Sequence, residues 1–303
     1  MDLSRTYPEG VAHVEGQYVP IGEARIPILD RGFVRSDATY DVVHVWKGWF
    51  FRLDDHLDRF ERNIAAIYLK LPHSRAEIAE ILTTCVRLSG LRESYVQMTC
   101  TRGLPHPGSR DPRLSVNRFY AFAIPFVWIA NDEQRKRGLR LIVSKRERIP
   151  PESLDPTVKN FHWIDMTLAL YEAYARDHEL PILSDRHGNL TEGPGVNLFM
   201  LKGGTLLTPG RGMFDGMTRR TVMELCAEAN VTIEEADIPG TALAAADEVF
   251  LSSTAGGIMP VSVVDGRKIG DGAPGPLTRR LHDLYWSKKE KGWLGTKIDY
   301  GKT

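Results

Sequence analysis

Apolar residues recur at two different spacings in the first third of the chain. Residues 11–46 read as strand-like, and the Lys47-Gly48 turn leads into another apolar run at residues 50–53, which together predict a meander of paired strands. From residue 54 the apolar positions are three or four residues apart, at Leu57, Phe60, Ile64, Ile67 and Leu71. This spacing predicts an amphipathic helix that runs from residue 54 through Leu71.

The rest of the chain mixes strands and helices without regular alternation. The expected strands cover residues 94–102, 119–124, 139–144 and 248–253, with several short ones between 181 and 208; the expected helices cover residues 75–88, 164–176, 218–228 and 277–286. Such a mixture predicts an α+β fold of two mixed lobes with a cleft between them.

A polar stretch marks the expected domain boundary. Residues 131–138 (NDEQRKRG) offer little to bury, so we interpret them as a linker. The interpretation gives a small N-terminal α+β domain at residues 1–130 and a large C-terminal domain at residues 139–303.

Composition favours small-molecule chemistry. The chain has 303 residues, of which 42% are hydrophobic, and no apolar run approaches the length of a membrane span. Thirty-nine basic and thirty-nine acidic side chains give a net charge of zero, so no overall field attracts nucleic acid or an anionic membrane. We therefore expect neither as a partner.

The three cysteines indicate a reducing compartment. Cys85, Cys100 and Cys226 are odd in number and scattered, which matches neither a disulfide framework nor a metal-ligand pattern. Residues 1–9 contain no apolar segment typical of a signal peptide. We expect a cytoplasmic protein without a metal site.

Two charged residues carry the candidate chemistry. Lys159 lies in the stretch DPTVKNF, and Glu192 follows about thirty residues later in LTEGPGVNLF. A lysine can form a Schiff base with an aldehyde, and a carboxylate can keep a pyridine nitrogen protonated. A protein that uses pyridoxal 5'-phosphate must supply both groups.

These stretches resemble the class IV aminotransferases, which are pyridoxal-phosphate enzymes of fold type IV, and above all the (R)-selective amine transaminases. The resemblance covers essentially the whole chain, and its main stretches are residues 52–56 (RLDDH), 155–161, 190–193 and 254–260 (TAGGIMP). It implies a smaller N-terminal α+β domain, a larger C-terminal pseudo-barrel domain, pyridoxal 5'-phosphate in the cleft between them, and a homodimer.

Carried over residue by residue, the resemblance makes Lys159 the Schiff-base lysine and Glu192 the partner of the pyridine nitrogen. The residues that it assigns to the cofactor phosphate are Arg59, Met217, Thr218 and Thr254, and Ser253 is also expected to bind the cofactor. The chemistry agrees, because a phosphate dianion favours an arginine fork, N–H groups at a helix start and hydroxyl donors. Each residue alone would be ordinary; their order along one chain is what points to a site.

Three further residues are expected to contact substrate. By resemblance, Tyr40 lines the substrate pocket and Arg110, in the turn-rich loop at residues 103–112, binds an acceptor carboxylate. Arg35 departs from the family pattern, which usually has histidine there, and a guanidinium could bind a carboxylate. The alternative for Arg35 is that it points to solvent or pairs with Asp37 or another acid, and the alternative for Arg110 is a solvated loop arginine.

The expected reaction is a ping-pong transfer of the amino group from an (R)-amine such as (R)-1-phenylethylamine to an oxo acid such as pyruvate. A D-amino-acid or branched-chain aminotransferase would use the same Lys159 and Glu192, so it remains an alternative. A lyase of the same fold and a non-catalytic protein that binds pyridoxal phosphate are less favoured alternatives.

Overall fold

The computed structural model describes residues 6–301, which form two compact units. Unit 1 holds the chain up to Val127, the short segment Val158–Phe161, and the chain from Lys289 onward; unit 2 holds Trp128–Thr157 and His162–Lys288. The predicted division at residues 131–138 falls close to the first change of unit. Sequence reasoning did not anticipate that residues 158–161 and the last segment belong with unit 1. Residues 1–5, on which the prediction of no signal peptide partly rests, lie outside the described residues.

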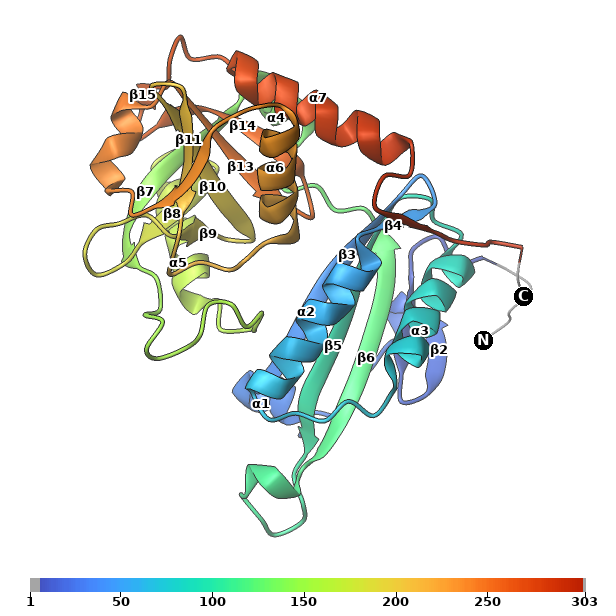
Figure 1. The fold of residues 1–303 in the computed structure, drawn as a ribbon. Helices are drawn as coiled ribbons and strands as arrows, with labels where there is room; N and C mark the ends of the chain where they lie inside the picture. The colour runs from blue at the N-terminus through green and yellow to red at the C-terminus, as the bar shows by residue number, and fades with distance from the viewer. Residues whose placement is uncertain (1–5, 302–303) are drawn as a thin grey trace. The chain divides into compact units, whose positions relative to one another are not determined.

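Unit 1 is built on a seven-stranded sheet with the order β16-β4-β3-β5-β6-β1-β2, and its neighbouring strands are antiparallel (Figure 1). The strands are β1 (Val11–Val14), β2 (Gln17–Pro20), β3 (Ala38–Trp46), β4 (Trp49–Phe51), β5 (Ser94–Leu104), β6 (Val116–Pro125) and β16 (Gly295–Lys297). The register places Val43, Val96, Ala123 and Val11 in one row across four strands. Because side chains alternate along a strand, this row lies on a single face of the sheet.

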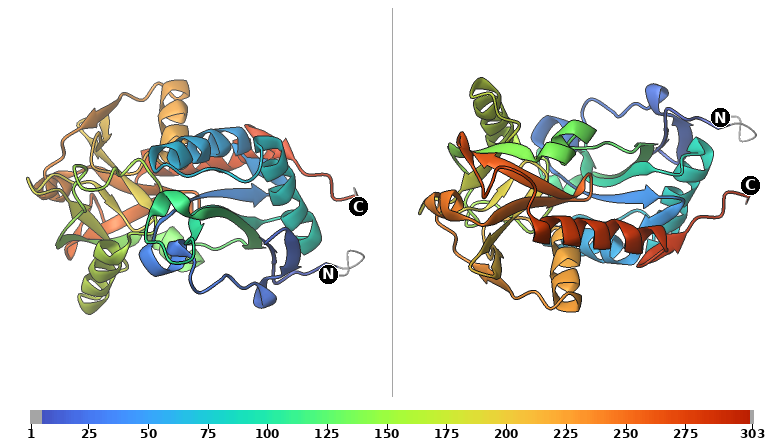
Figure 2. Two further views of the ribbon diagram at one scale, coloured as in Figure 1. Left: turned by 90° about the horizontal axis from the view of Figure 1, so that it is seen from below. Right: turned by 90° about the horizontal axis from the view of Figure 1, so that it is seen from above.

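Two helices cover that face, α2 (Leu53–Ala66) and α3 (Arg75–Ser89) (Figures 1 and 2). The core residues of both helices pack in one cluster with the row of strand residues. Ser74 and Glu77 form a capping box at the start of α3. The predicted extension of α2 through Leu71 is wrong, because the helix ends at Ala66 and Tyr68 takes a left-handed backbone conformation with φ +57°.

The segment before β3 is not the continuous strand-like run that was predicted. It contains the short helices η1 (Ile21–Glu23) and α1 (Arg31–Arg35). Asp30 caps α1 by accepting a hydrogen bond from Gly32 N at 2.8 Å. A Cβ on Gly32 would lie 2.5 Å from Thr101 Cγ2, so close packing against β5 requires glycine there.

Unit 2 is built on a nine-stranded sheet that mixes parallel and antiparallel pairs. Its main path is β12-β11-β10-β13-β14-β7-β8, with β15 pairing β14 and β9 pairing β10. The strands are β7 (Leu139–Glu147), β8 (Leu180–Ser184), β9 (Glu192–Gly193), β10 (Val196–Lys202), β11 (Thr205–Pro209), β12 (Ile233–Ala236), β13 (Glu248–Ser253), β14 (Gly257–Val264) and β15 (Arg267–Lys268). Helices and sheets occur together in each unit, which confirms the predicted α+β class.

The helices of unit 2 are α4 (Asp132–Arg137), α5 (Ile164–Ala175), α6 (Met217–Glu228), α7 (Pro276–Glu290) and the short η3 (Gly240–Ala245). Helix α4 stands where a linker was predicted, because Asn131 and Gln134 form a capping box that stabilises one turn of a wholly polar segment. The expected helices at residues 164–176, 218–228 and 277–286 are confirmed within a few residues.

The loop between β5 and β6 starts from a glycine with little room around it. Gly103 has φ +72°, and a Cβ built there would lie 1.7 Å from the carbonyl oxygen of Val116. Gly108, at the loop tip, has nearly the same backbone angle, φ +73°, but no atom within 4 Å of its added Cβ. A comparison of Gly103 and Gly108 therefore separates the cost of the positive φ from the cost of a steric collision.

We predict that Gly103→Ala lowers the free energy of unfolding by about 3 kcal/mol, because a positive φ and a backbone collision act together. Gly108→Ala should cost only about 1 kcal/mol, the strain of the left-handed backbone alone. Denaturant unfolding of the two variants and the parent measures the difference. Equal losses in both variants would show that the collision at Val116 is relieved without cost.

Candidate active-site residues

Lys159 is fixed to unit 1 by its backbone. Its carbonyl oxygen accepts a hydrogen bond from Thr39 Oγ1 at 2.6 Å and from Tyr40 N at 3.3 Å, and Asn160 forms an isolated antiparallel bridge with Thr39. The pairing occurs along the part of β3 that β4 leaves open, since β4 pairs only with Val45 and Trp46. The lysine is therefore placed by sheet pairing although it lies outside every strand.

The side chain of Lys159 lies over an aromatic ring. Its Nζ is 4.7 Å from the centroid of the Tyr40 ring, which stacks on Phe161 with centroids 4.5 Å apart. Two of the predicted residues, Lys159 and Tyr40, are thus brought together within unit 1. The amine lies beside an apolar aromatic surface.

Arg59 is buried in unit 1 and binds Asp41. Its Nε and Nη2 donate to the two oxygens of the Asp41 carboxylate at 2.7 and 2.8 Å, and His56 Nδ1 lies 2.8 Å from Asp41 Oδ1. Asp41 is on the helix-covered face of β3, two residues before Val43, so its carboxylate meets Arg59 and His56 of α2. The guanidinium proposed for the phosphate is held in place by this carboxylate.

Burial and neighbouring charges shift the pKa values of Asp41 and His56. Burial alone would raise the pKa of Asp41, but the charges of Arg59 and then His56 outweigh it and hold the pKa well below its usual range. Burial lowers the pKa of His56, and Asp41 offsets only part of that shift. The cluster therefore holds a carboxylate and a guanidinium at neutral pH.

Glu192 is buried in unit 2 and each of its oxygens has a defined partner. Arg148 Nε donates to Oε1 at 3.0 Å, and the backbone N–H of Phe214 donates to Oε2 at 3.0 Å. Arg148 also binds Asp165, through Nη1 to Oδ2 at 2.7 Å. Burial would lower the pKa of Arg148, but Glu192 and Asp165 raise it, so the guanidinium keeps its charge and keeps Glu192 oriented as a carboxylate.

Asn197 contacts the elements that carry the predicted phosphate residues of unit 2. This residue pairs in register with Glu192 on one side and with Ser252, next to Ser253, on the other. Its side-chain amide donates to Phe214 O at 2.7 Å, and its Oδ1 lies so close to Gly216 that a Cβ there would be 2.2 Å away. One asparagine thus holds together Glu192, the end of β13 and the start of α6.

The start of α6 and the turn after β13 offer donors for an anion. Met217 and Thr218 open α6 after the N-cap Gly216, which has no side chain to satisfy the first N–H groups. Within residues 6–301, the hydroxyls of Thr218 and Thr254 donate no hydrogen bond to another residue. Ser253 differs, because its Oγ accepts from Ala255 N at 3.2 Å and shapes the turn.

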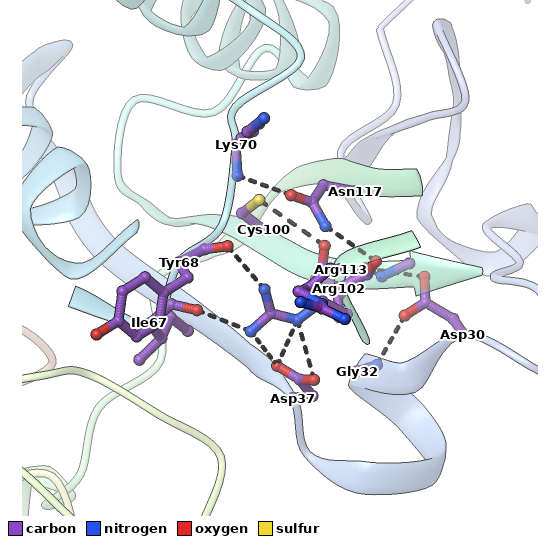
Figure 3. Close-up of polar contacts among 12 residues, drawn as sticks. Asp30, Gly32, Asp37, Ile67, Tyr68, Lys70, Cys100, Arg102, Arg113 and Asn117 are labelled. Carbon is purple, nitrogen blue, oxygen red and sulfur yellow. Dashed lines mark hydrogen bonds and ion pairs between the residues drawn. The ribbon is translucent and has the colours of Figure 1, made fainter. Parts of the chain in front are cut away.

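Arg35 and Arg110 line one pocket in unit 1. Its volume is about 290 Å³, and its lining residues are Leu29, Arg31, Val34, Arg35, Pro105, Ser109 and Arg110. Tyr40 is not among them. The alternative that Arg35 pairs with Asp37 is wrong, since Asp37 binds Arg102 instead (Figure 3). Arg35 and Arg110 are both exposed, as is expected of arginines that point to solvent.

Sequence reasoning missed Asp41, His56, Arg148, Asp165 and Asn197. One signal was available: Asp41 is an acid in a largely apolar strand, and a buried charge needs a partner. His56 lay inside the RLDDH stretch but was given no role. No local sequence pattern indicated Arg148 or Asp165, since their importance depends on contacts that form only in the folded chain.

Comparison with known proteins shows the family of this chain. The family model described as amino-transferase class IV matches residues 38–264. The chain belongs to the class IV aminotransferases. It is 28% identical to a putative branched-chain-amino-acid aminotransferase of Methanocaldococcus jannaschii, over 94% of this chain and 98% of that protein. It is 29% identical to a D-alanine aminotransferase of Listeria monocytogenes, over 90% and 93%.

A solved structure agrees with this assignment. The T.th. branched-chain amino acid aminotransferase with pyridoxamine 5'-phosphate superposes with a TM-score of 0.89 at 25% identity, covering 96% of this chain and 99% of that one. The resemblance of the 303-residue chain to fold type IV is confirmed, and as a class IV aminotransferase the chain uses pyridoxal 5'-phosphate. Its substrates are accordingly amino compounds and oxo acids.

The donor set of the aminotransferase fits that cofactor. Unit 1 supplies an amine on Lys159 and a buried guanidinium on Arg59, and unit 2 supplies the Glu192 carboxylate together with the N–H and hydroxyl donors of Thr218 and Thr254. These are the groups that an aldehyde, a phosphate and a pyridine nitrogen require. No helix among the described residues is both long enough and apolar enough to span a membrane.

We predict that Asp41→Asn lowers the free energy of unfolding of the aminotransferase by about 3–5 kcal/mol at neutral pH, because it removes the Asp41 charge from a buried ion pair with Arg59. The pKa of Asp41 is lower in the folded than in the unfolded chain, so its contribution is full above about pH 4 and is lost as the pH falls further. The free energies of unfolding of the Asp41→Asn variant and of the parent should therefore converge at acid pH. Denaturant unfolding at several pH values measures this.

Asp58→Asn is the matched control. Asp58 is also on α2 and also pairs with an arginine, Arg75, at 2.7 Å, but both side chains reach solvent. An ion pair at the surface contributes less than about 1 kcal/mol. If Asp41→Asn were as mild as Asp58→Asn, the buried ion pair would not be the element that holds Arg59.

Proposed function

We propose that Lys159 and Glu192 are the catalytic residues of this aminotransferase. Bound pyridoxal 5'-phosphate supplies a ring that withdraws electrons from the donor carbon. Lys159 Nζ carries a proton away from that carbon and later returns a proton as a general acid. Glu192 accepts a hydrogen bond from the pyridine N–H and keeps that nitrogen protonated, because Arg148 and the Phe214 N–H hold the carboxylate in one orientation.

The phosphate is proposed to bind Arg59, the N–H groups of Met217 and Thr218, and the Thr254 hydroxyl. Two observations support this set: Arg59 is oriented by Asp41, and the α6 start has no side-chain cap. Ser253 takes part indirectly, since its Oγ orders the turn that carries Thr254. Anchoring the phosphate fixes the ring relative to the catalytic residues.

The proposed donor is an (R)-amine such as (R)-1-phenylethylamine, and the proposed acceptor is an oxo acid such as pyruvate. The proposal of an amine donor rests on the stacked pair of Tyr40 and Phe161 beside Lys159 Nζ. This pair offers an aromatic surface without charge. Arg110 is proposed to receive the carboxylate of the acceptor.

A D-amino acid is the second candidate donor. Among residues 6–301 no carboxylate forms an ion pair with Arg35 or Arg110, so both guanidiniums can receive one from a substrate. The D-alanine aminotransferase of Listeria monocytogenes is among the relatives, which also favours this class. Branched-chain amino acids remain the alternative named by other relatives.

We infer that the enzyme works as a homodimer, as the resemblance implied. Ile28, Leu29 and Phe33 are 73%, 65% and 64% exposed in the single chain, and they lie within one short stretch before β3. A cluster of large exposed apolar side chains favours a surface that a protein partner covers. A cytoplasmic location is likewise proposed, supported by three buried cysteines that form no disulfide.

A substrate panel tests the donor class. (R)- and (S)-1-phenylethylamine, D- and L-alanine and branched-chain amino acids are each paired with pyruvate. The proposal expects turnover of the (R)-amine over the (S)-amine. A strong preference for L-branched-chain donors would replace it with the branched-chain alternative.

Within that panel, we predict that Arg35→Ala lowers kcat/KM for D-alanine about ten- to hundredfold more than for (R)-1-phenylethylamine, because only D-alanine carries a carboxylate for the guanidinium. Arg113→Ala is the control, since Arg113 is exposed and already bound to Asp111. Equal effects of Arg35→Ala on both donors would refute a role in carboxylate binding.

A further inference from the structure

Arg148 is shared by two carboxylates in unit 2. Its Nε donates to Glu192 Oε1 at 3.0 Å, and its Nη1 donates to Asp165 Oδ2 at 2.7 Å. Arg148 and Glu192 are buried, and the Asp165 side chain is only 13% exposed. We call these three side chains the Arg148 triad. Because they are largely removed from water, the charge of each one acts strongly on the other two.

Three parts of unit 2 bring the triad together. Arg148 directly follows β7, and its backbone N–H donates to the carbonyl oxygen of Ser184 in β8 at 2.9 Å. Glu192 begins β9, which pairs with β10. Asp165 lies in the first turn of α5, where the N–H groups of the helix start favour a negative charge. The backbone therefore holds each member of the triad in place.

Asp165 uses only one of its two carboxylate oxygens for hydrogen bonds. Oδ2 accepts from Arg148 Nη1 and, at 3.2 Å, from the backbone N–H of Ile149. Oδ1 is buried and accepts no hydrogen bond from any group of residues 6–301. An asparagine with its amide oxygen in the place of Oδ2 would accept the same two bonds. What an acid adds at this position is therefore its charge.

The formal charges of the triad sum to minus one. Glu192 and Asp165 each contribute one negative charge, and Arg148 contributes one positive charge. Arg148 and Glu192 alone would be neutral, so a pyridinium bound at Glu192 would leave a buried positive charge without compensation. With Asp165 present, the triad and the pyridinium are neutral together. Asp165 thus restores the attraction for a cation that Arg148 takes away from Glu192.

We propose that Asp165 is a positioning residue for the amino transfer, which offsets the charge of Arg148 and so lets Glu192 hold the pyridine nitrogen of the cofactor in its protonated form. The proposal rests on the role proposed above for Glu192. Asp165 acts through Arg148, which it contacts, and its effect is electrostatic. Removal of its charge should therefore change the site even where the hydrogen bonds are kept.

Two cofactors that differ at one ring position measure this effect. The full-length chain is freed of cofactor and titrated with pyridoxal 5'-phosphate or with its 1-deaza analogue, in which a C–H group replaces the pyridine nitrogen. Both carry the aldehyde and the phosphate, but only the natural cofactor can be protonated on the ring. Asp165→Asn should weaken binding of pyridoxal 5'-phosphate about tenfold, which corresponds to about 1.4 kcal/mol, and change binding of the analogue by less than about twofold.

Variants of the triad separate charge from structure. Asp165→Glu keeps the charge and should retain most of the preference for the natural cofactor. The double variant Arg148→Gln/Asp165→Asn removes one charge of each sign, leaves the sum at minus one, and should keep the preference that Asp165→Asn loses. Because it removes a buried ion pair as a unit, the double variant also tests the proposal if Asp165→Asn does not fold.

Glu172→Gln is the matched control. Glu172 is an acid two turns further along α5, where it accepts from Ser144 Oγ at 2.7 Å and pairs with Arg176 at 3.7 Å. Its replacement removes a negative charge from the same helix but not from the triad. Both dissociation constants should stay unchanged.

The remaining outcomes distinguish this proposal from the function above. Equal weakening of both cofactors in Asp165→Asn, or a double variant that loses the preference, would show a structural role and overturn the proposal. A preference that is lost in Glu192→Gln but kept in Asp165→Asn would also overturn it and leave the proposed function standing. A preference that survives in Glu192→Gln would refute Glu192 as the partner of the pyridine nitrogen, and with it the function on which the role of Asp165 rests.

Discussion

The proposed chemistry depends on the pairing of one carbonyl group with strand β3. The backbone of Lys159 is held by Thr39 and Tyr40, which places the lysine in unit 1 although the chain on either side of residues 158–161 belongs to unit 2. A lysine side chain has many rotamers, so a fixed backbone and an aromatic ring beside it reduce the freedom that a reacting amine must lose. Pairing with β3 thus fixes the backbone of a lysine that lies in a loop.

The arginines of this chain differ in whether an acid holds the guanidinium. Arg59 and Arg148 are buried and oriented by ion pairs, Arg59 with Asp41 and Arg148 with Asp165 and Glu192. Arg31, Arg35 and Arg110 line a pocket and form no ion pair within residues 6–301, while Asp37 and Asp111 nearby are bound by Arg102 and Arg113. A pocket lined by three guanidiniums that form no ion pair among the described residues favours an anionic ligand.

Sequence periodicity predicted most helices and strands, because one buried face repeats visibly in the apolar positions. It failed where a polar or backbone feature decided the structure. Helix α2 ends at Ala66, two residues before the left-handed Tyr68, and a capping box stabilises helix α4 where a linker was expected. Lys159 and Glu192 could be proposed from motifs. Asp41, Arg148 and Asn197 could not, because a buried polar residue is explained only by partners that the fold brings to it.

The most direct test of the account is to identify the lysine that binds the cofactor. Borohydride reduction of the holoenzyme followed by peptide mapping should place the pyridoxyl group on Lys159, and Lys159→Ala should lose at least about 10³-fold in turnover. Reduced cofactor on any other lysine, or a Lys159→Ala enzyme that retains its rate, would contradict the central claim.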